Sequence, residues 1–141
     1  MKRSPALTAL SRDHHHALVV AQRLTRAQPE SADAATRGFL AFWQPEGQTH
    51  FRLEEEVLLP AYAAYGDPSH PAVVQTLVDH IVIRRDAQIV ERDPTLASLI
   101  ALGVRLAAHV RHEERRLFPL IEQAVPAPEL QALAHRLDSP T

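Results

Sequence analysis

Cysteine is absent from the 141-residue chain, which excludes disulfides, thiolate metal sites and a cysteine nucleophile. A large charge of one sign is absent too, since the formal net charge of −2 offers no footprint for nucleic acid or an anionic membrane. Long apolar runs are missing, so the N-terminus does not resemble a signal peptide, and no segment is expected to span a bilayer. These absences predict a cytoplasmic protein without a nucleic-acid or membrane partner.

Glycine and aromatic residues are scarce, whereas Ala, Leu, Arg and Glu are abundant and no strand alternation is present. We therefore expect an all-α fold. The expected long helices cover residues 5–28, 31–65, 72–91 and 95–124. Pro45 and Gly47 should kink the second helix at 44–48. Residues 128–137 are expected to form one short C-terminal helix against the bundle or a frayed tail.

Short connections make sequential helices antiparallel neighbours, which predicts an up-down-up-down antiparallel four-helix bundle. An open array of helices packed at steep angles is the alternative, and the short loops disfavour it. The chain length suits a single domain over residues 1–141. Within it we expect the bundle core at about 5–125 and a C-terminal extension at 126–141.

Two segments of the chain recur at constant offsets. Residues 50–60 align with residues 109–119, which superimposes two His-x-x-x-Glu pairs and two prolines. Residues 13–22 align with residues 79–88, which superimposes two Asp-His dipeptides. The first two helices therefore resemble the last two, and we expect a pseudo-two-fold internal repeat in the bundle.

Each His-x-x-x-Glu pair places its two side chains on one helix face, about 5–6 Å apart. Leu58 and Leu117 continue these faces, so both pairs are expected to point into the core. A carboxylate among leucines needs a partner or a metal. Two inward glutamates and four inward histidines form a cage of donors that suits iron, manganese or zinc better than calcium. The two carboxylates can bridge two divalent ions.

The run His14–His16 offers three candidates for the inward position of the first helix. His14 aligns with His80 in the repeat and shares a helix face with Leu10 and Ala17. His15 and His16 are rotated from it by roughly 100–200°. We therefore expect His14 to point inward and the other two to lie behind it or in solvent.

The neighbouring residues are interpreted as structural. Three glutamates lie off the inward stripe, and we expect a solvated face with local pairs to arginines: Glu55, Glu56 and Glu114 with Arg52, Arg111 and Arg115. Three aromatic residues are expected to pack in the core: Phe39, Phe42 and Trp43. His70 and His135 are expected to be exposed and inert.

The segments RDHHHAL, HFRLEEEVLLP, VDH and HVRHEERRLFP resemble the hemerythrin-like, HHE cation-binding domain family over roughly residues 7–125. Helix order, both His-x-x-x-Glu pairs and the following Leu-Pro or Phe-Pro all match. The resemblance implies two non-haem iron ions, which an oxo or hydroxo group can bridge, with manganese or zinc less expected. Carried over residue by residue, it implies the metal ligands His14, His50, Glu54, His80, His109 and Glu113.

Two departures from the oxygen-carrying hemerythrins concern these ligands. In those proteins, which this chain resembles, a second histidine follows the third-helix histidine by one turn. This chain has Arg84 at that position. Their last carboxylate follows its histidine by five residues, whereas Glu113 follows by four. At least one iron is then short of a protein ligand. An exogenous ligand is the expectation ahead of His15, His16 or His112, and an open position favours chemistry or sensing over oxygen storage.

Three classes of function remain open. The favoured one is a di-iron protein that binds a small ligand (oxygen, nitric oxide or peroxide) for sensing, storage or stress defence. The second is a di-iron enzyme that reduces peroxide or nitric oxide with an unidentified electron donor, although no acid–base residue beyond the ligands supports it. The third is an iron-responsive structural or interaction module. An apolar, filled core favours a small ligand; it is expected between Leu10, Phe42, Leu58, Ile83, Leu106 and Leu117.

Overall fold

The computed structural model describes residues 3–138, and within that range the chain is helical and contains no strand. The expectation of an all-α fold is therefore confirmed. The α-helices are α1 (Thr8–Thr25), α2 (Ala32–Phe42), α3 (Gln48–Leu53), α4 (Leu59–Ala63), α5 (Pro71–Arg92), α6 (Leu96–His112), α7 (Phe118–Ala124) and α8 (Ala127–Asp138). Every helix of the described range is too short or too polar to cross a membrane.

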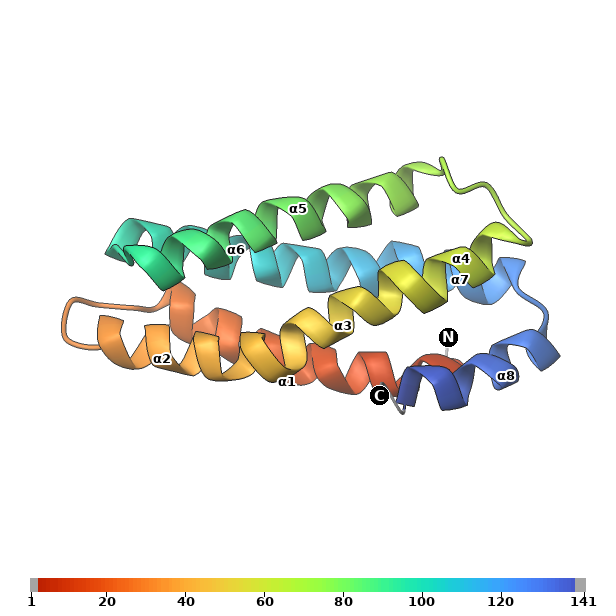
Figure 1. The fold of residues 1–141 in the computed structure, drawn as a ribbon, viewed down its shortest axis with the longest axis horizontal. Coiled ribbons are helices and arrows are strands. Elements are labelled where there is room, and N and C mark those ends of the chain that lie inside the picture. The colour runs from red at the N-terminus through yellow and green to blue at the C-terminus, as the bar shows by residue number, and fades with distance from the viewer. Residues whose placement is uncertain (1–2, 139–141) are drawn as a thin grey trace.

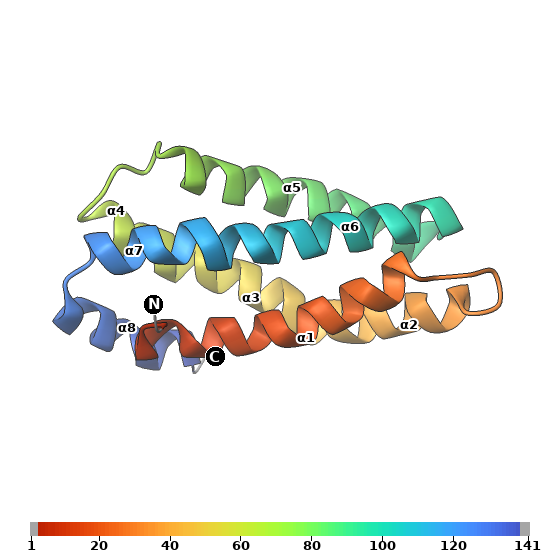
Figure 2. The same cartoon turned by 180° about the vertical axis from the view of Figure 1, so that it is seen from behind.

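The helices form four elongated rods that lie side by side (Figure 1). The first rod is α1; α2, α3 and α4 follow one another in the second; α5 is the third; α6 and α7 make the fourth. The connections α1–α2 and α5–α6 lie at one end of the molecule, and the connection α4–α5 lies at the other. Figure 2 shows α8 folded back beside the N-terminal segment, so residues 127–138 are a packed helix rather than a frayed tail.

Side-chain caps fix where several helices begin. Ser4 stands just before Pro5, and its hydroxyl accepts a hydrogen bond from the amide of Ala6, as expected for the start of a helix. The hydroxyl of Thr95 accepts from the amide of Ser98, whose hydroxyl accepts from the amide of Thr95. His70 also caps a helix, because its Nδ1 accepts the Ala72 amide at the start of α5. His70 is also partly buried, so the expectation that it is exposed was wrong.

Wide π-helical turns interrupt the second and fourth rods. One covers Trp43–Gly47, at the kink expected from Pro45. The other two, Glu54–Leu58 and Glu113–Leu117, were not expected, and each stands directly before a Leu-Pro or Phe-Pro pair. In each of them an amide bonds to the carbonyl five residues earlier, which relieves the clash that a proline causes in a regular helix.

Apolar side chains fill the interior on both sides of a polar middle layer. One cluster surrounds the three aromatic residues expected in the core, where the rings of Phe39 and Trp43 stack with centroids 5.8 Å apart. The second cluster joins the N-terminal segment, α7 and α8 around Leu10, Leu58 and Leu117. Because both ends of the bundle are closed by apolar packing, polar residues between them lie far from bulk water.

α1 and α6 pack closely together at Gly103. A Cβ atom built on Gly103 would stand 2.7 Å from the carbonyl oxygen of Ala21 and 2.8 Å from the Cβ of Leu24. To make room for this Cβ, α1 would have to move away from α6, and His14 lies on the same helix. Gly103 therefore helps set the spacing that the polar layer requires.

We expect Gly103→Ala to lower the free energy of unfolding by about 1–3 kcal/mol, the usual cost of overpacking a filled interior. Gly38→Ala is the matched control, since a Cβ at Gly38 would meet no atom within 4 Å. That control should raise the unfolding free energy by about 0.5–1 kcal/mol, because alanine is the better helix former. Urea titration of both variants measures the effect, and equal stabilities would contradict it.

Candidate metal centre

The polar middle layer is built from six buried residues contributed by all four rods. Their relative exposures are between 0 and 6%, although each is a histidine or a glutamate. They are the six that the family resemblance implied: His14, His50, Glu54, His80, His109 and Glu113. Because charged side chains are rarely buried without a partner, this layer is a candidate functional site.

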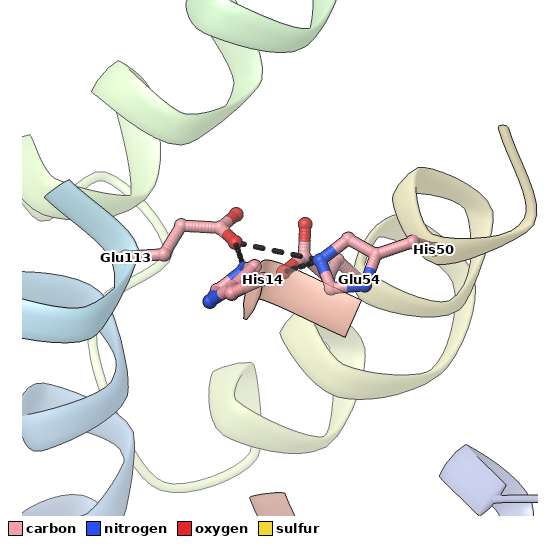
Figure 3. Close-up of side chains that lie close together, drawn as sticks. All are labelled: His14, His50, Glu54 and Glu113. Carbon is pink, nitrogen blue, oxygen red and sulfur yellow. Dashed lines mark hydrogen bonds and ion pairs between the residues drawn. The ribbon is translucent and has the colours of Figure 1, made fainter. Parts of the chain in front are cut away.

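The six residues form two groups of four that share both glutamates. One group contains His14 and His50, the other His80 and His109, and each also contains Glu54 and Glu113. Within each group one ligand atom per residue lies within 4.8 Å of the others. Figure 3 shows the first group, in which the Glu113 carboxylate points toward the imidazoles of His14 and His50. Two cations that share two carboxylates would fit this arrangement of donors.

Short contacts join the Nε2 atoms of the histidines to the two carboxylates. His14 Nε2 lies 2.7 Å from Glu113 Oε1, and His80 Nε2 lies 3.0 Å from Glu54 Oε1. The i,i+4 pairs are equally close, with Nε2 3.0 Å from Oε2 in both His50–Glu54 and His109–Glu113. All four imidazoles therefore turn Nε2 inward, onto these two carboxylates.

Four of these inward atoms are buried without a hydrogen-bond partner in the described range: His50 Nε2, Glu54 Oε2, His109 Nε2 and Glu113 Oε2. The i,i+4 contacts are short, but their angles do not make hydrogen bonds. Buried polar atoms left unpaired are costly, and here they converge from both groups. Imidazole nitrogen and carboxylate oxygen are suitable ligands for iron, manganese or zinc, so the residues fit a divalent metal centre.

The Nδ1 atom of each of the four histidines contacts a further carboxylate on another helix. His14 Nδ1 lies 2.6 Å from Glu114 Oε2, and His80 Nδ1 lies 2.6 Å from Glu55 Oε2. The other two contacts are His50 Nδ1 with Asp13 Oδ2 at 3.0 Å and His109 Nδ1 with Asp79 Oδ2 at 2.9 Å. Such a carboxylate accepts a hydrogen bond from Nδ1–H and leaves Nε2 to face a metal, as is usual for metal-binding histidines.

The expectation for Glu55 and Glu114 was therefore wrong. Neither makes the local arginine pair that was expected; Glu55 bonds Arg84 and Glu114 bonds Arg3, each beside its histidine contact. Glu56 is exposed, in keeping with a solvated position. The sequence repeat contained the missing signal, because Glu55 matches Glu114 and Asp13 matches Asp79 at the offsets that align the inward residues.

The remaining histidines stay outside the two groups. His15, His16 and His135 are exposed, and His16 Nδ1 lies 2.6 Å from Glu46. The ring of His112 contacts the carbonyl oxygen of Ala72 through Nε2 at 2.9 Å. Arg84, where a further histidine would stand in the oxygen-carrying hemerythrins, points its guanidinium at Glu55. Inside the described range, then, the structure adds no seventh side chain to the cluster.

The buried carboxylates favour protonated imidazoles in the metal-free protein. Burial disfavours the charge on His80, but the nearby Glu113 carboxylate, the hydrogen bond with Glu54 and the charges of both glutamates outweigh it and raise its pKa to about 9. Burial is likewise outweighed at His109, where the charge of Glu113 and the hydrogen bond with Asp79 raise the pKa to about 10. The pKa of Glu113 falls well below its usual value, because attraction to His109 overcomes burial. The cluster thus stores protons that a metal would displace.

A small cavity adjoins the first group of donor residues. It offers about 10 Å³ to the centre of a water molecule, which is close to the room that one water needs. Its lining is mainly apolar, with Asp13, His14, His50 and His109 as the polar members. The other wall consists of Ala17, Phe42, Trp43, Gly47, Phe51, Leu106 and Val110. The room beside these residues is thus that of about one water molecule.

The profile of the hemerythrin HHE cation binding domain matches residues 6–121. The chain belongs to this family. The matched range contains all six inward residues of the hemerythrin HHE domain described here, together with the four carboxylates at Nδ1. No curated protein and no solved structure gave a significant match. The donor chemistry of the site and the family agree on a cation, while the assignment of the six residues as its ligands stays a prediction.

We expect His14→Ala to lose far more bound metal than His15→Ala. His14 is 4% exposed and contacts Glu113, whereas His15 is exposed at the adjacent position on the same helix. Metal analysis of both variants after purification under the same conditions provides the measurement. A larger loss from His15→Ala would move the ligand to the neighbouring residue.

Metal binding near neutral pH should release protons, because His80 and His109 have pKa values of about 9 and 10 before binding. The apparent affinity should therefore rise as the pH rises from about 6 to 8. Calorimetry in two buffers of different ionisation enthalpy measures the released protons, and equal heats would contradict the expectation. The raised pKa values also stabilise the metal-free fold. This stabilisation is fully present when the pH is below 6.5, the usual pKa of histidine, and it is lost as the pH rises through about 9 and 10.

Proposed function

We propose that the chain is a non-haem di-iron protein that binds a small ligand such as oxygen, nitric oxide or peroxide, for sensing, storage or stress defence. The observation that carries this proposal is the pair of four-residue groups that share Glu54 and Glu113. A carboxylate shared by two groups has one oxygen for each ion, so two ions are the natural complement of the six residues. Iron is favoured over manganese or zinc because the chain belongs to the hemerythrin HHE family.

In this proposal His14 and His50 would hold one iron and His80 and His109 the other, and Glu54 and Glu113 would serve both. The proposed arrangement places the two halves of an up-down-up-down bundle about an approximate two-fold axis. The matching Nδ1 contacts support such a relation, since Asp13–His50 corresponds to Asp79–His109 and Glu114–His14 to Glu55–His80. When bound, the iron pair would supply a redox-active Lewis acid with a coordination position for a small ligand.

The protein's own contribution is to limit the size of the ligand that can reach that position and the amount of water around it. The adjoining cavity has room for about one water-sized molecule and is lined mainly by apolar and aromatic side chains. Ligands of two or three atoms fit, and nothing in the lining could orient a larger substrate. Asp13 and His50 both line the cavity, and Asp13 Oδ2 lies 3.0 Å from His50 Nδ1. The carboxylate of Asp13 keeps the Nδ1 proton of His50 in place.

Protein expressed with iron should contain two iron ions per chain, and Glu54→Ala should reduce that content severely because both groups use Glu54. Glu56→Ala is the matched control, two residues along the same turn and exposed, and should keep its iron. Metal analysis of the three proteins decides. Absence of any bound transition metal from the unmodified protein would exclude the proposal, and equal iron in both variants would exclude the shared carboxylate.

The class of function is tested by reducing the iron protein anaerobically, adding oxygen, nitric oxide or peroxide, and recording the visible spectrum. The proposed small-ligand function predicts a persistent new band that disappears when the ligand is removed. Rapid oxidation to a resting ferric state, together with repeated peroxide consumption when reductant is supplied, would contradict this prediction. It would indicate that the protein is an enzyme. No spectral change with any of the three ligands would leave a structural role for the iron.

A further inference from the structure

Two arginines stand behind two of the four inward histidines, at positions that the sequence repeat does not relate. Arg84 lies one turn after His80 on α5, and the matching position after His14 on α1 is Leu18. On the His14 side the arginine is Arg3, from the N-terminal segment. Two residues that are 81 positions apart in the chain thus each contact a glutamate beside an inward histidine.

On the His80 side a carboxylate, an aromatic ring and a guanidinium form one packed unit. Arg84 Nη1 donates to Glu55 Oε2 at 2.6 Å, and the same oxygen contacts His80 Nδ1 at 2.6 Å. The ring of Phe51 stacks on the His80 imidazole with centroids 3.8 Å apart and planes 8° from parallel. Arg84 Cζ lies 5.4 Å from the centroid of Phe51, on whose ring it rests. His80 is therefore held both along its Nδ1–H bond and across its ring.

On the His14 side the same kinds of group meet. Arg3 Nη2 donates to Glu114 Oε1 at 3.2 Å and to the Glu114 carbonyl oxygen at 2.7 Å. Glu114 Oε2 contacts His14 Nδ1 at 2.6 Å, and Phe118 stacks on His14 at 5.3 Å with planes 12° apart. Arg3 Cζ lies 5.3 Å from the centroid of Phe118. Phe51 and Phe118 are not equivalent in the repeat, so this likeness is an outcome of folding.

The other two histidines lack this support. Asp13 and Asp79, which contact His50 and His109, make no ion pair with an arginine in the described range. Asp79 is bonded instead by the neutral amide of Gln75 at 2.7 Å. His50 and His109 each have an inward glutamate one turn later at 3.0 Å, whereas His14 and His80 sit on helices without an inward glutamate. The arginines are found where the local helix provides no alignment.

We propose that Arg84 and Arg3 are positioning residues of the metal centre, which hold His80 and His14 in the ligand orientation through Glu55 and Glu114. This inference rests on the proposed metal centre. Each guanidinium fixes its glutamate in place, and the fixed carboxylate accepts a hydrogen bond from Nδ1–H and so keeps Nε2 directed inward. Arg84 therefore supports the ligand His80. It does so from the position at which the oxygen-carrying hemerythrins, which this chain resembles, have a further histidine ligand. Arg3 makes the N-terminal segment part of the centre.

The probe for this proposal is Co²⁺, added to the metal-free protein. In the loaded protein, each ligand imidazole should give one paramagnetically shifted, exchangeable N–H resonance, and its rate of exchange with water reports how firmly the Nδ1 proton is held. Arg84→Met keeps the apolar stem over Phe51 but loses both donors to Glu55. It should speed the exchange of one resonance and weaken one equivalent of Co²⁺ about 10-fold, the lower end of the range for losing an outer partner.

Further variants separate positioning from folding. Arg3→Met should affect a different resonance from Arg84→Met, and Arg84→Lys, which keeps a charge and a donor, should restore much of the loss. Arg85→Met is the matched control on the same helix, since Arg85 bonds Asp86, which also has Arg105 as a partner. Its exchange rates and Co²⁺ affinity should equal those of the unmodified protein.

The outcomes are distinct. If Arg84→Met and Arg85→Met show the same exchange rates and the same Co²⁺ affinity, the positioning role is excluded while the metal centre stands. If both Arg84→Met and Arg84→Lys lower the unfolding midpoint of the metal-free protein and leave the exchange rates unchanged, the arginine is only structural. If the unmodified protein binds no Co²⁺, the proposed metal centre itself fails.

Discussion

Two buried carboxylates at the middle of an apolar bundle are the constraint on which the rest of this structure depends. Glu54 and Glu113 are fully buried, and each belongs to both groups of inward donors. A carboxylate in such a place needs positive charge around it, and four imidazoles from four rods provide it in the metal-free protein. A divalent ion would provide it more compactly, because it also satisfies the inward atoms that no hydrogen bond reaches.

Around this centre the charges are arranged in successive layers of alternating sign. The inner glutamates face imidazoles, the imidazoles face a second set of carboxylates, and on two sides these carboxylates face arginines near the surface. Each layer makes the next easier to bury, so the cost of placing charge in the interior is spread over several residues. The arginines also shield Phe51 and Phe118 from solvent, and the two rings pack on His80 and His14.

The backbone adapts to the same centre. Glu54 and Glu113 each begin a π-helical turn, and each turn ends just before a Leu-Pro or Phe-Pro pair. The extra residue in a π turn lets the rod carry both an inward His-Glu pair and a proline that a regular helix would not accept at that place. Helix irregularity and donor geometry thus coincide at the two glutamates. Gly103 adds a further adjustment, since the α1–α6 spacing leaves no room for a Cβ there.

The sequence by itself determined the helical class and which face of each helix points inward, because periodicity and the repeated His-x-x-x-Glu pairs are local properties of the chain. It also contained the two Asp-His dipeptides, which align in the repeat. Their aspartates, Asp13 and Asp79, make equivalent contacts with His50 and His109. Only the tertiary structure decided the partners on the outer side of the histidines. Glu55 and Glu114 lie beside arginines within their own helices, and local spacing therefore favoured surface pairs, whereas Arg3 reaches Glu114 across 111 residues of chain. Spacing along one helix states which side a residue occupies, but the group that meets it there comes from another helix and is set by packing.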